Sequence, residues 1–190
     1  DKILFSMYER HHAKAKETII HFLRELFSLL GDADISVKIT GSIGMGISEK
    51  CSLPFVQEVV SATKAIQQGY PHVGSMIDIG GEDAKVVFFK DAEAIDLRMN
   101  GNCAGGTGAF IDQMAVILGV NVEELNRLAL NATRVYPIAS RCGVFCKTDI
   151  QNLVARNVSR EDIAASIFHA VAVQTVITLA HGYDIETPVL

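Results

Sequence analysis

The sequence lacks the features that mark several classes of protein. Its 17 lysine and arginine residues are outnumbered by 22 aspartate and glutamate residues, so the net charge of −5 gives no basic footprint for nucleic acid or an anionic membrane. No uninterrupted apolar run reaches about 18 residues, from which we expect no membrane-spanning helix. The nearest candidate, residues 163–180, is broken by His169 and Gln174. With only four cysteines, a disulfide framework is disfavoured and a reducing compartment, the cytoplasm, is expected.

Familiar catalytic and metal-ligand patterns are missing as well. The histidines show no ligand spacing, and neither a Ser-His-Asp arrangement nor a nucleophile elbow is present. Cys142 and Cys146 form Cys-x-x-x-Cys, which differs from the Cys-x-x-Cys of redox motifs and zinc ribbons. Cys51 has no partner pattern, which favours a structural role.

What the sequence does have is the composition of a globular protein with a sizeable core. Of its 190 residues 49 % are hydrophobic, and the mean hydropathy is +0.26. Hydrophobic periodicity and β-branched runs predict strands at 2–6, 35–40, 76–79, 84–89, 94–99 and 136–139, and helices at 12–30, 55–68, 108–118, 122–130, 149–157 and 160–181, with a glycine-rich loop at 41–46. This alternation indicates an α/β fold with a mixed sheet and a domain boundary near Gly74.

A glycine-rich turn between two apolar strands is the first candidate site. It consists of Asp78, Gly80, Gly81, Glu82, Asp83 and Lys85. Glycine lets backbone N–H groups approach an anion closely, and Asp78 and Asp83 are suited to holding Mg²⁺ through water beside a phosphate. An ordinary hairpin turn would have the same residues, so the local pattern alone leaves both interpretations open.

A second glycine-rich turn carries a cysteine into a predicted helix. Cys103 is followed by Gly105, Gly106, Thr107 and Gly108. The positive end of the helix that follows would stabilise a thiolate and offer N–H donors to cluster sulfides. A buried structural cysteine in a tight turn is the alternative.

Cys103 and Cys142 each stand where a turn leads into a helix and are framed by small or polar residues. Two thiolates cannot complete a four-ligand metal or iron–sulfur site, whereas two copies of the chain supply four. The pair therefore suggests a homodimer that shares one cluster.

Three ordered motifs together resemble one family. They are residues 77–86, residues 99–110 and residues 140–145. Their sequences and spacing resemble the ATP-dependent activators of 2-hydroxyacyl-CoA dehydratases, a family that includes the ATPase subunits of benzoyl-CoA reductase. The similarity covers most of the chain and is strongest from Gly74 to Asn157.

The resemblance implies a fold of the acetate and sugar kinase, heat-shock protein and actin type. Residues 1–74 would be part of one ATPase subdomain, and residues 75–190 part of the second, which carries the cluster cysteines. It implies ATP or ADP with Mg²⁺ at the two glycine-rich turns, and a homodimer with one [4Fe–4S] cluster held by Cys103 and Cys142 of each copy. ATP hydrolysis would drive one electron from a reduced ferredoxin or flavodoxin-type donor, through the cluster, to a dehydratase or reductase-type acceptor.

The sequence also departs from the family pattern. The family's first phosphate turn would lie before Asp1 and its adenosine-binding segment after Leu190, so we expect a fold incomplete at both ends that binds nucleotide poorly. Glu82 replaces a common glutamine, and Cys146 is often absent from the smaller activators, which indicates a long multidomain branch. A sugar-type kinase of the same fold and a non-catalytic domain are the competing hypotheses. A kinase needs a catalytic base and no cysteine pair.

Overall fold

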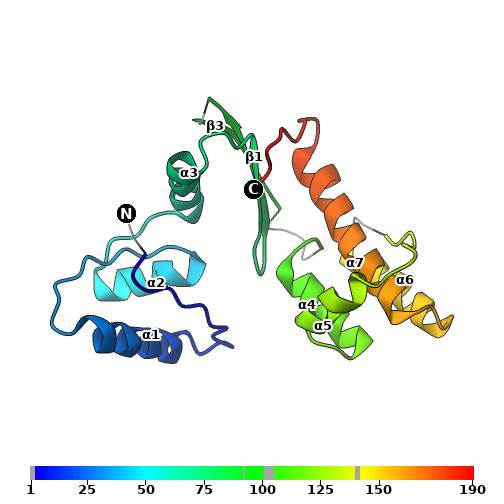
Figure 1. Ribbon diagram of the computed structural model, residues 1–190, viewed down its shortest axis with the longest axis horizontal. Helices are drawn as coiled ribbons and strands as arrows, with labels where there is room; N and C mark the ends of the chain where they lie inside the picture. The colour runs from blue at the N-terminus through cyan, green and yellow to red at the C-terminus, as the bar shows by residue number, and fades with distance from the viewer. Residues whose placement is uncertain (1–2, 92, 101–104, 140–141) are drawn as a thin grey trace. The chain divides into compact units, whose positions relative to one another are not determined.

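The computed structural model describes residues 3–91, 93–100, 105–139 and 142–190 (Figure 1). The chain forms two compact units, residues 1–64 and 65–190, which divide within a helix. The assignment of residues 1–74 and 75–190 to two ATPase subdomains stays a prediction.

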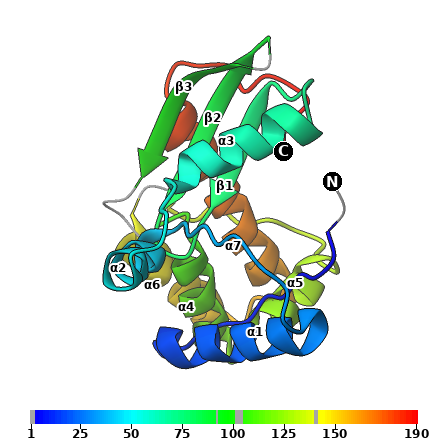
Figure 2. The same ribbon diagram turned by 90° about the vertical axis from the view of Figure 1, so that its left-hand side faces the viewer.

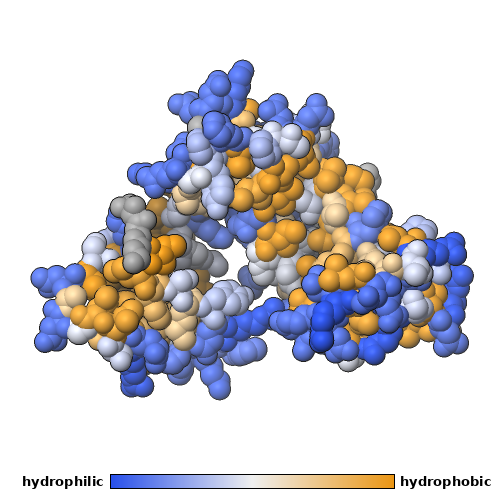
Figure 3. Space-filling model, in the orientation of Figure 1, coloured by the Kyte–Doolittle hydropathy of each residue, from blue (hydrophilic) through white to orange (hydrophobic). Residues whose placement is uncertain are grey.

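The first unit contains α1 (Ala15–Leu30), α2 (Ser42–Cys51) and the start of α3 (Glu58–Gly69). α1 is amphipathic but has no buried residue, and Leu23, Phe27 and Leu29 are exposed. Figure 3 shows apolar atoms on the visible surface of this part of the chain. The first unit therefore has little core of its own among its described residues.

Two expectations in this unit are wrong. Residues 35–40 do not form a strand; Ile39 makes only an isolated parallel bridge with Phe55. Residues 41–46 are not a loop, because α2 begins at Ser42. A Cβ at Gly44 would lie 2.5 Å from Cγ2 of Ile39, so this glycine allows close packing rather than a turn.

After the end of α3, the second unit continues with an antiparallel sheet of β1 (Ser75–Ile79), β2 (Ala84–Lys90) and β3 (Glu93–Asn100), in that order (Figure 2). Val189 makes only an isolated parallel bridge with Ser75, so the described sheet is antiparallel where a mixed sheet was expected. Val86 and Phe88 pack against Leu179 and Ala180 and form a small core on one face of β2.

A larger core joins the helices that follow the sheet. These are α4 (Gly108–Leu118), α5 (Val122–Ala129), α6 (Gly143–Ala155) and α7 (Arg160–Gln174), which continues as the π-helix η1 (Thr175–Ala180). Met114, Leu125, Ile150 and Ile167 have no exposed surface. Ser159 caps α7 by accepting a hydrogen bond from the N–H of Asp162.

The length of the apolar runs led us to expect no helix able to span a membrane, and the helix over residues 160–180 corrects this expectation. By length and composition it is able to cross a membrane, but 56 % of its most apolar window is buried inside the protein. Ile163, Ala164 and Ile167 belong to the large core. This burial is typical of the central helix of a globular unit.

Three further elements differ from the sequence-based predictions. α6 begins at Gly143, six residues before its predicted start. Residues 136–139 form no strand, and residues 3–6 form none either; residue 2 lies outside the described ranges. The backbone of 133–139 is held instead by carboxylate and hydroxyl groups of α6 and α7.

Candidate functional site

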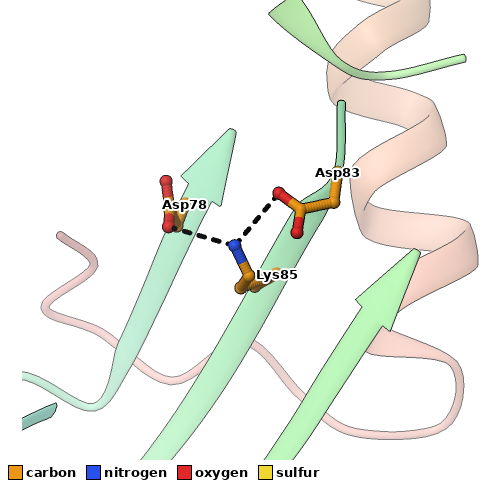
Figure 4. Close-up of polar contacts among 3 residues, drawn as sticks. All are labelled: Asp78, Asp83 and Lys85. Carbon is orange, nitrogen blue, oxygen red and sulfur yellow. Dashed lines mark hydrogen bonds and ion pairs between the residues drawn. The ribbon is translucent and has the colours of Figure 1, made fainter. Parts of the chain in front are cut away.

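The turn between β1 and β2 contains a three-residue ion-pair network (Figure 4). Asp78 and Lys85 are direct cross-strand partners, so their side chains lie on the same face of the sheet. Lys85 Nζ lies 3.0 Å from Asp83 Oδ1 and 3.8 Å from Asp78 Oδ2. The lysine side chain is 5 % exposed, whereas the two carboxylates are about a third exposed. One buried cation thus holds two carboxylates that remain open to solvent.

Gly80 leaves room for the carboxylate of Asp83 in this geometry. A Cβ on Gly80 would lie 2.6 Å from Asp83 Oδ1, so any other residue at this position would displace the carboxylate. Gly81 and Glu82 are exposed at the tip of the turn, and nothing lies within 4 Å of a Cβ built on Gly81. The tip is therefore accessible, while its base is fixed.

The same turn is joined to the start of α4. The backbone N–H of Gly108 donates to Gly80 O at 2.8 Å, and that of Ala109 donates to Gly81 O at 2.9 Å. Buried Thr107 caps the helix and accepts from the N–H of Phe110. The first donors of α4 are thus used inside the chain, and the turn and the helix are mechanically coupled.

The start of α6 approaches the segment that precedes α4. A Cβ on Gly143 would lie 3.6 Å from Cδ2 of Phe110 and 3.9 Å from Gly105 N. Cys142 is the N-cap of α6, is partly exposed, and makes no side-chain capping hydrogen bond. Gly105, Gly106, Cys142 and Gly143 line one small cavity. The predicted Cys103 lies outside the described residues.

Cys146 also lines this cavity, but it belongs to the buried core. Burial, and then the charge of Asp149, raise the pKa of its thiol to about 11. Because the thiolate is the form that binds metal, this environment favours a neutral structural thiol. Among the described residues, no group of three or more His, Cys, Asp or Glu side chains is arranged to hold a metal ion.

The three motifs therefore meet in one region of the second unit: the β1–β2 turn, the glycines before α4, and the start of α6. A family model described as the BadF/BadG/BcrA/BcrD ATPase family matches residues 6–189. The chain belongs to that family.

Individual relatives are similar to the chain over more than half of its length. The chain is 37 % identical over 121 residues to the (R)-2-hydroxyglutaryl-CoA dehydratase activating ATPase of Acidaminococcus fermentans, covering 64 % of this chain and 46 % of the relative. It is 32 % identical over 154 residues to the 2-hydroxyisocaproyl-CoA dehydratase activator of Clostridioides difficile, covering 79 % of this chain and 57 % of the relative. The chain thus spans about half the length of these relatives.

A solved structure shares the fold. The activator of 2-hydroxyisocaproyl-CoA dehydratase from Clostridium difficile, with bound ADPNP, aligns with a TM-score of 0.79 at 32 % identity and covers 90 % of this chain and 64 % of that one. This match confirms the predicted ATPase-type α/β fold, with mixed helices and a small sheet.

Sequence reasoning missed the residues that hold the approach to Cys142. Asp162 Oδ1 accepts from the N–H groups of Thr133 and Arg134, both at 2.9 Å, and Asp149 Oδ2 accepts from that of Ala139 at 2.8 Å. Neither carboxylate stands in a sequence pattern that would predict this role. Gln174 lines the cavity, and the sequence does distinguish it, because it is a polar residue inside the most apolar helix.

Proposed function

We propose that the chain is part of an ATP-hydrolysing reductive activator, which as a whole protein passes one electron to a 2-hydroxyacyl-CoA dehydratase-type partner. The observation that carries the proposal is the direct bonding of the glycine-rich turn to α4, next to the start of α6 at Cys142. Membership of an ATPase family, and relatives named as dehydratase activators, support it.

In this proposal the β1–β2 turn binds the phosphates of the nucleotide. Asp78 and Asp83 would hold Mg²⁺ through water on the phosphates of ATP or ADP, and Lys85 keeps the two carboxylates in place. The glycines at 80, 81, 105, 106 and 108, with Glu82 and Thr107, would complete the phosphate side. Because Gly108 and Ala109 are bonded to the carbonyls of the turn, a shift of the turn on hydrolysis would move α4.

In this proposal the cysteines that precede α4 and α6 hold the redox centre. The thiol of Cys142 suits a metal ligand, since it is partly exposed and makes no capping bond at a helix N-terminus. Two copies of the chain would each give Cys103 and Cys142 to one [4Fe–4S] cluster, which when bound would supply a one-electron carrier. The electron would come from a reduced ferredoxin or flavodoxin-type protein, in the reducing cytoplasm.

The test is iron and sulfide content, with molecular mass, after anaerobic purification. Half a cluster of iron and sulfide per chain in a dimer is the expected result. Cys142→Ala should lose the iron, while Cys51→Ala, at an exposed position that does not line the cavity, should keep it. An iron-free wild-type protein, or equal iron in both variants, would contradict the proposal.

A further inference from the structure

Gln174 is a buried polar side chain with no hydrogen-bond partner in the described part of the chain. It is 5 % exposed near the end of α7, and its amide makes no hydrogen bond to any described residue. Leaving a buried amide unpaired costs about 1–3 kcal/mol, so such a group calls for a reason. Within the described ranges, Ser75 Oγ is the only fully sealed side-chain polar atom without a partner, so the Gln174 amide opens onto a space.

That space is the cavity beside Cys142. Gln174 lines it together with Gly105, Gly106 and Cys142, and its volume of about 10 Å³ suits one water-sized group. The walls are largely apolar, so it is the unpaired amide of Gln174 that gives the cavity a place for a hydrogen-bonding partner.

The backbone is shaped to bring Gln174 to this place. Gly106 has a φ of +82°, and a Cβ there would lie 2.9 Å from Cγ of Gln174. A side chain at position 106 would push the glutamine away. The chain changes from α-helix to π-helix at Thr175, directly after Gln174, and such changes are frequent at functional sites.

Gln174 also lines a second cavity, with Asn100 and Thr178, but that cavity has no room for a water-sized group. In the cavity beside Cys142, the other described side chains able to form a hydrogen bond are Cys142 and Cys146. Cys146 is a neutral thiol in the core, and a thiol is a weak acceptor. Cys142 is partly exposed, and as a metal ligand its sulfur would be an anionic acceptor. A glutamine amide carries two N–H donors, and hydrogen bonds to ligating sulfur shift the potential of an iron–sulfur centre.

We propose that Gln174 donates a hydrogen bond, directly or through one water, to Sγ of Cys142 when that sulfur ligates the cluster, and thereby raises the reduction potential. Gln174 is a positioning residue that acts through Cys142. The inference rests on the proposed function above and adds the residue that adjusts how readily the centre accepts its electron.

The experiment is a redox titration of the anaerobically purified protein, followed by electron paramagnetic resonance. Gln174→Met keeps the length of the side chain but removes the donor. We expect it to retain iron and to lower the ratio of reduced to oxidised centre about tenfold at a fixed potential, which is about 59 mV for one electron. Gln174→Glu, which places a negative charge there, should lower the ratio further.

The control is Gln151→Met, at an exposed position on α6, which should leave the potential unchanged. An iron-loaded Gln174→Met with the wild-type potential overturns this inference and leaves the proposed function standing. Loss of iron from both Gln174 variants, with unchanged circular dichroism, overturns it in favour of a purely structural role. A wild-type protein without iron overturns the proposed function, and the inference with it.

Discussion

The two halves of the candidate site satisfy their polar groups in different ways. In the β1–β2 turn, Lys85 lies between two carboxylates, and the carbonyls of Gly80 and Gly81 receive N–H groups of α4. Beside Cys142, the amide of Gln174 has no described partner, and the cysteine makes no capping bond. The first half is preorganised by the chain itself, whereas the second has hydrogen-bonding capacity left for something that binds.

The largest effect on stability is expected from a substitution in the β1–β2 turn. Lys85→Met would leave two adjacent carboxylates without their cation, and we expect the free energy of unfolding to fall by about 3 kcal/mol, the lower end for a disrupted buried pair because both carboxylates reach solvent. Urea denaturation measures it. Lys90→Met, at an exposed position on the same strand, should change stability by less than about 0.5 kcal/mol. Equal midpoints for the two variants would show that the ion pairs do not stabilise the turn.

The next largest effect on stability tests how closely Gly106 packs against Gln174 in the cavity beside Cys142. Gly106→Ala should destabilise by about 2 kcal/mol, because the residue has a positive φ and its new Cβ would meet Gln174. Gly119→Ala is the matched control: it has φ +66° but nothing within 4 Å, so only the backbone strain of about 1 kcal/mol remains. If thermal unfolding gives the same loss for both, the contact with Gln174 does not constrain the cavity.

Gly106 also illustrates what the sequence could and could not predict. The turn at 78–85 was predicted because glycine and acidic residues follow one another there, and the described turn at 105–107 because glycines cluster there. The elements α4, β1 and β2 were predicted because their periodicity is strong. The partner of Gly106 is on a helix far along the chain, and no local pattern connects the two.

The errors have the same origin. The glycines at 41, 44 and 46 predicted a loop, yet Gly44 serves a contact with Ile39 that becomes visible only in three dimensions. The alternating residues 136–139 predicted a strand, but Tyr136 and Ala139 donate to Ser166 and Asp149 instead of a neighbouring strand. Local patterns identify elements; long-range side-chain partners decide which of them form.

A smaller effect is expected in the alkylation rates of the two thiols that line the cavity, Cys142 and Cys146. Since burial and Asp149 raise the pKa of Cys146 to about 11, only roughly one thiol in a thousand is ionised at pH 8. In iron-free protein we expect iodoacetamide to modify partly exposed Cys142 at least about tenfold faster than Cys146, as measured by tandem mass spectrometry. In urea the two rates should converge. Equal rates in the native protein would mean that Cys146 is accessible and open to a ligand role.

The smallest effect concerns the carboxylate that anchors the approach to Cys142. The N–H groups of Thr133 and Arg134 donate to Asp162, and these bonds lower its pKa from the ordinary 3.8. The unfolded chain therefore takes up this proton at a higher pH than the folded chain does, so the stability that Asp162 contributes is present above about pH 4 and is lost as the pH falls through the folded value.

Asp162→Asn removes that titration, and its unfolding free energy should fall less steeply than that of the wild type below about pH 4, while at neutral pH the variant should be the less stable of the two. Urea midpoints measured from pH 6 to pH 3 give both slopes. Exposed Asp184→Asn should follow the wild-type curve. If Asp162→Asn follows it too, the two backbone bonds do not depend on the charge, and the segment before Cys142 is held by packing and by Ser166 and Asp149 alone.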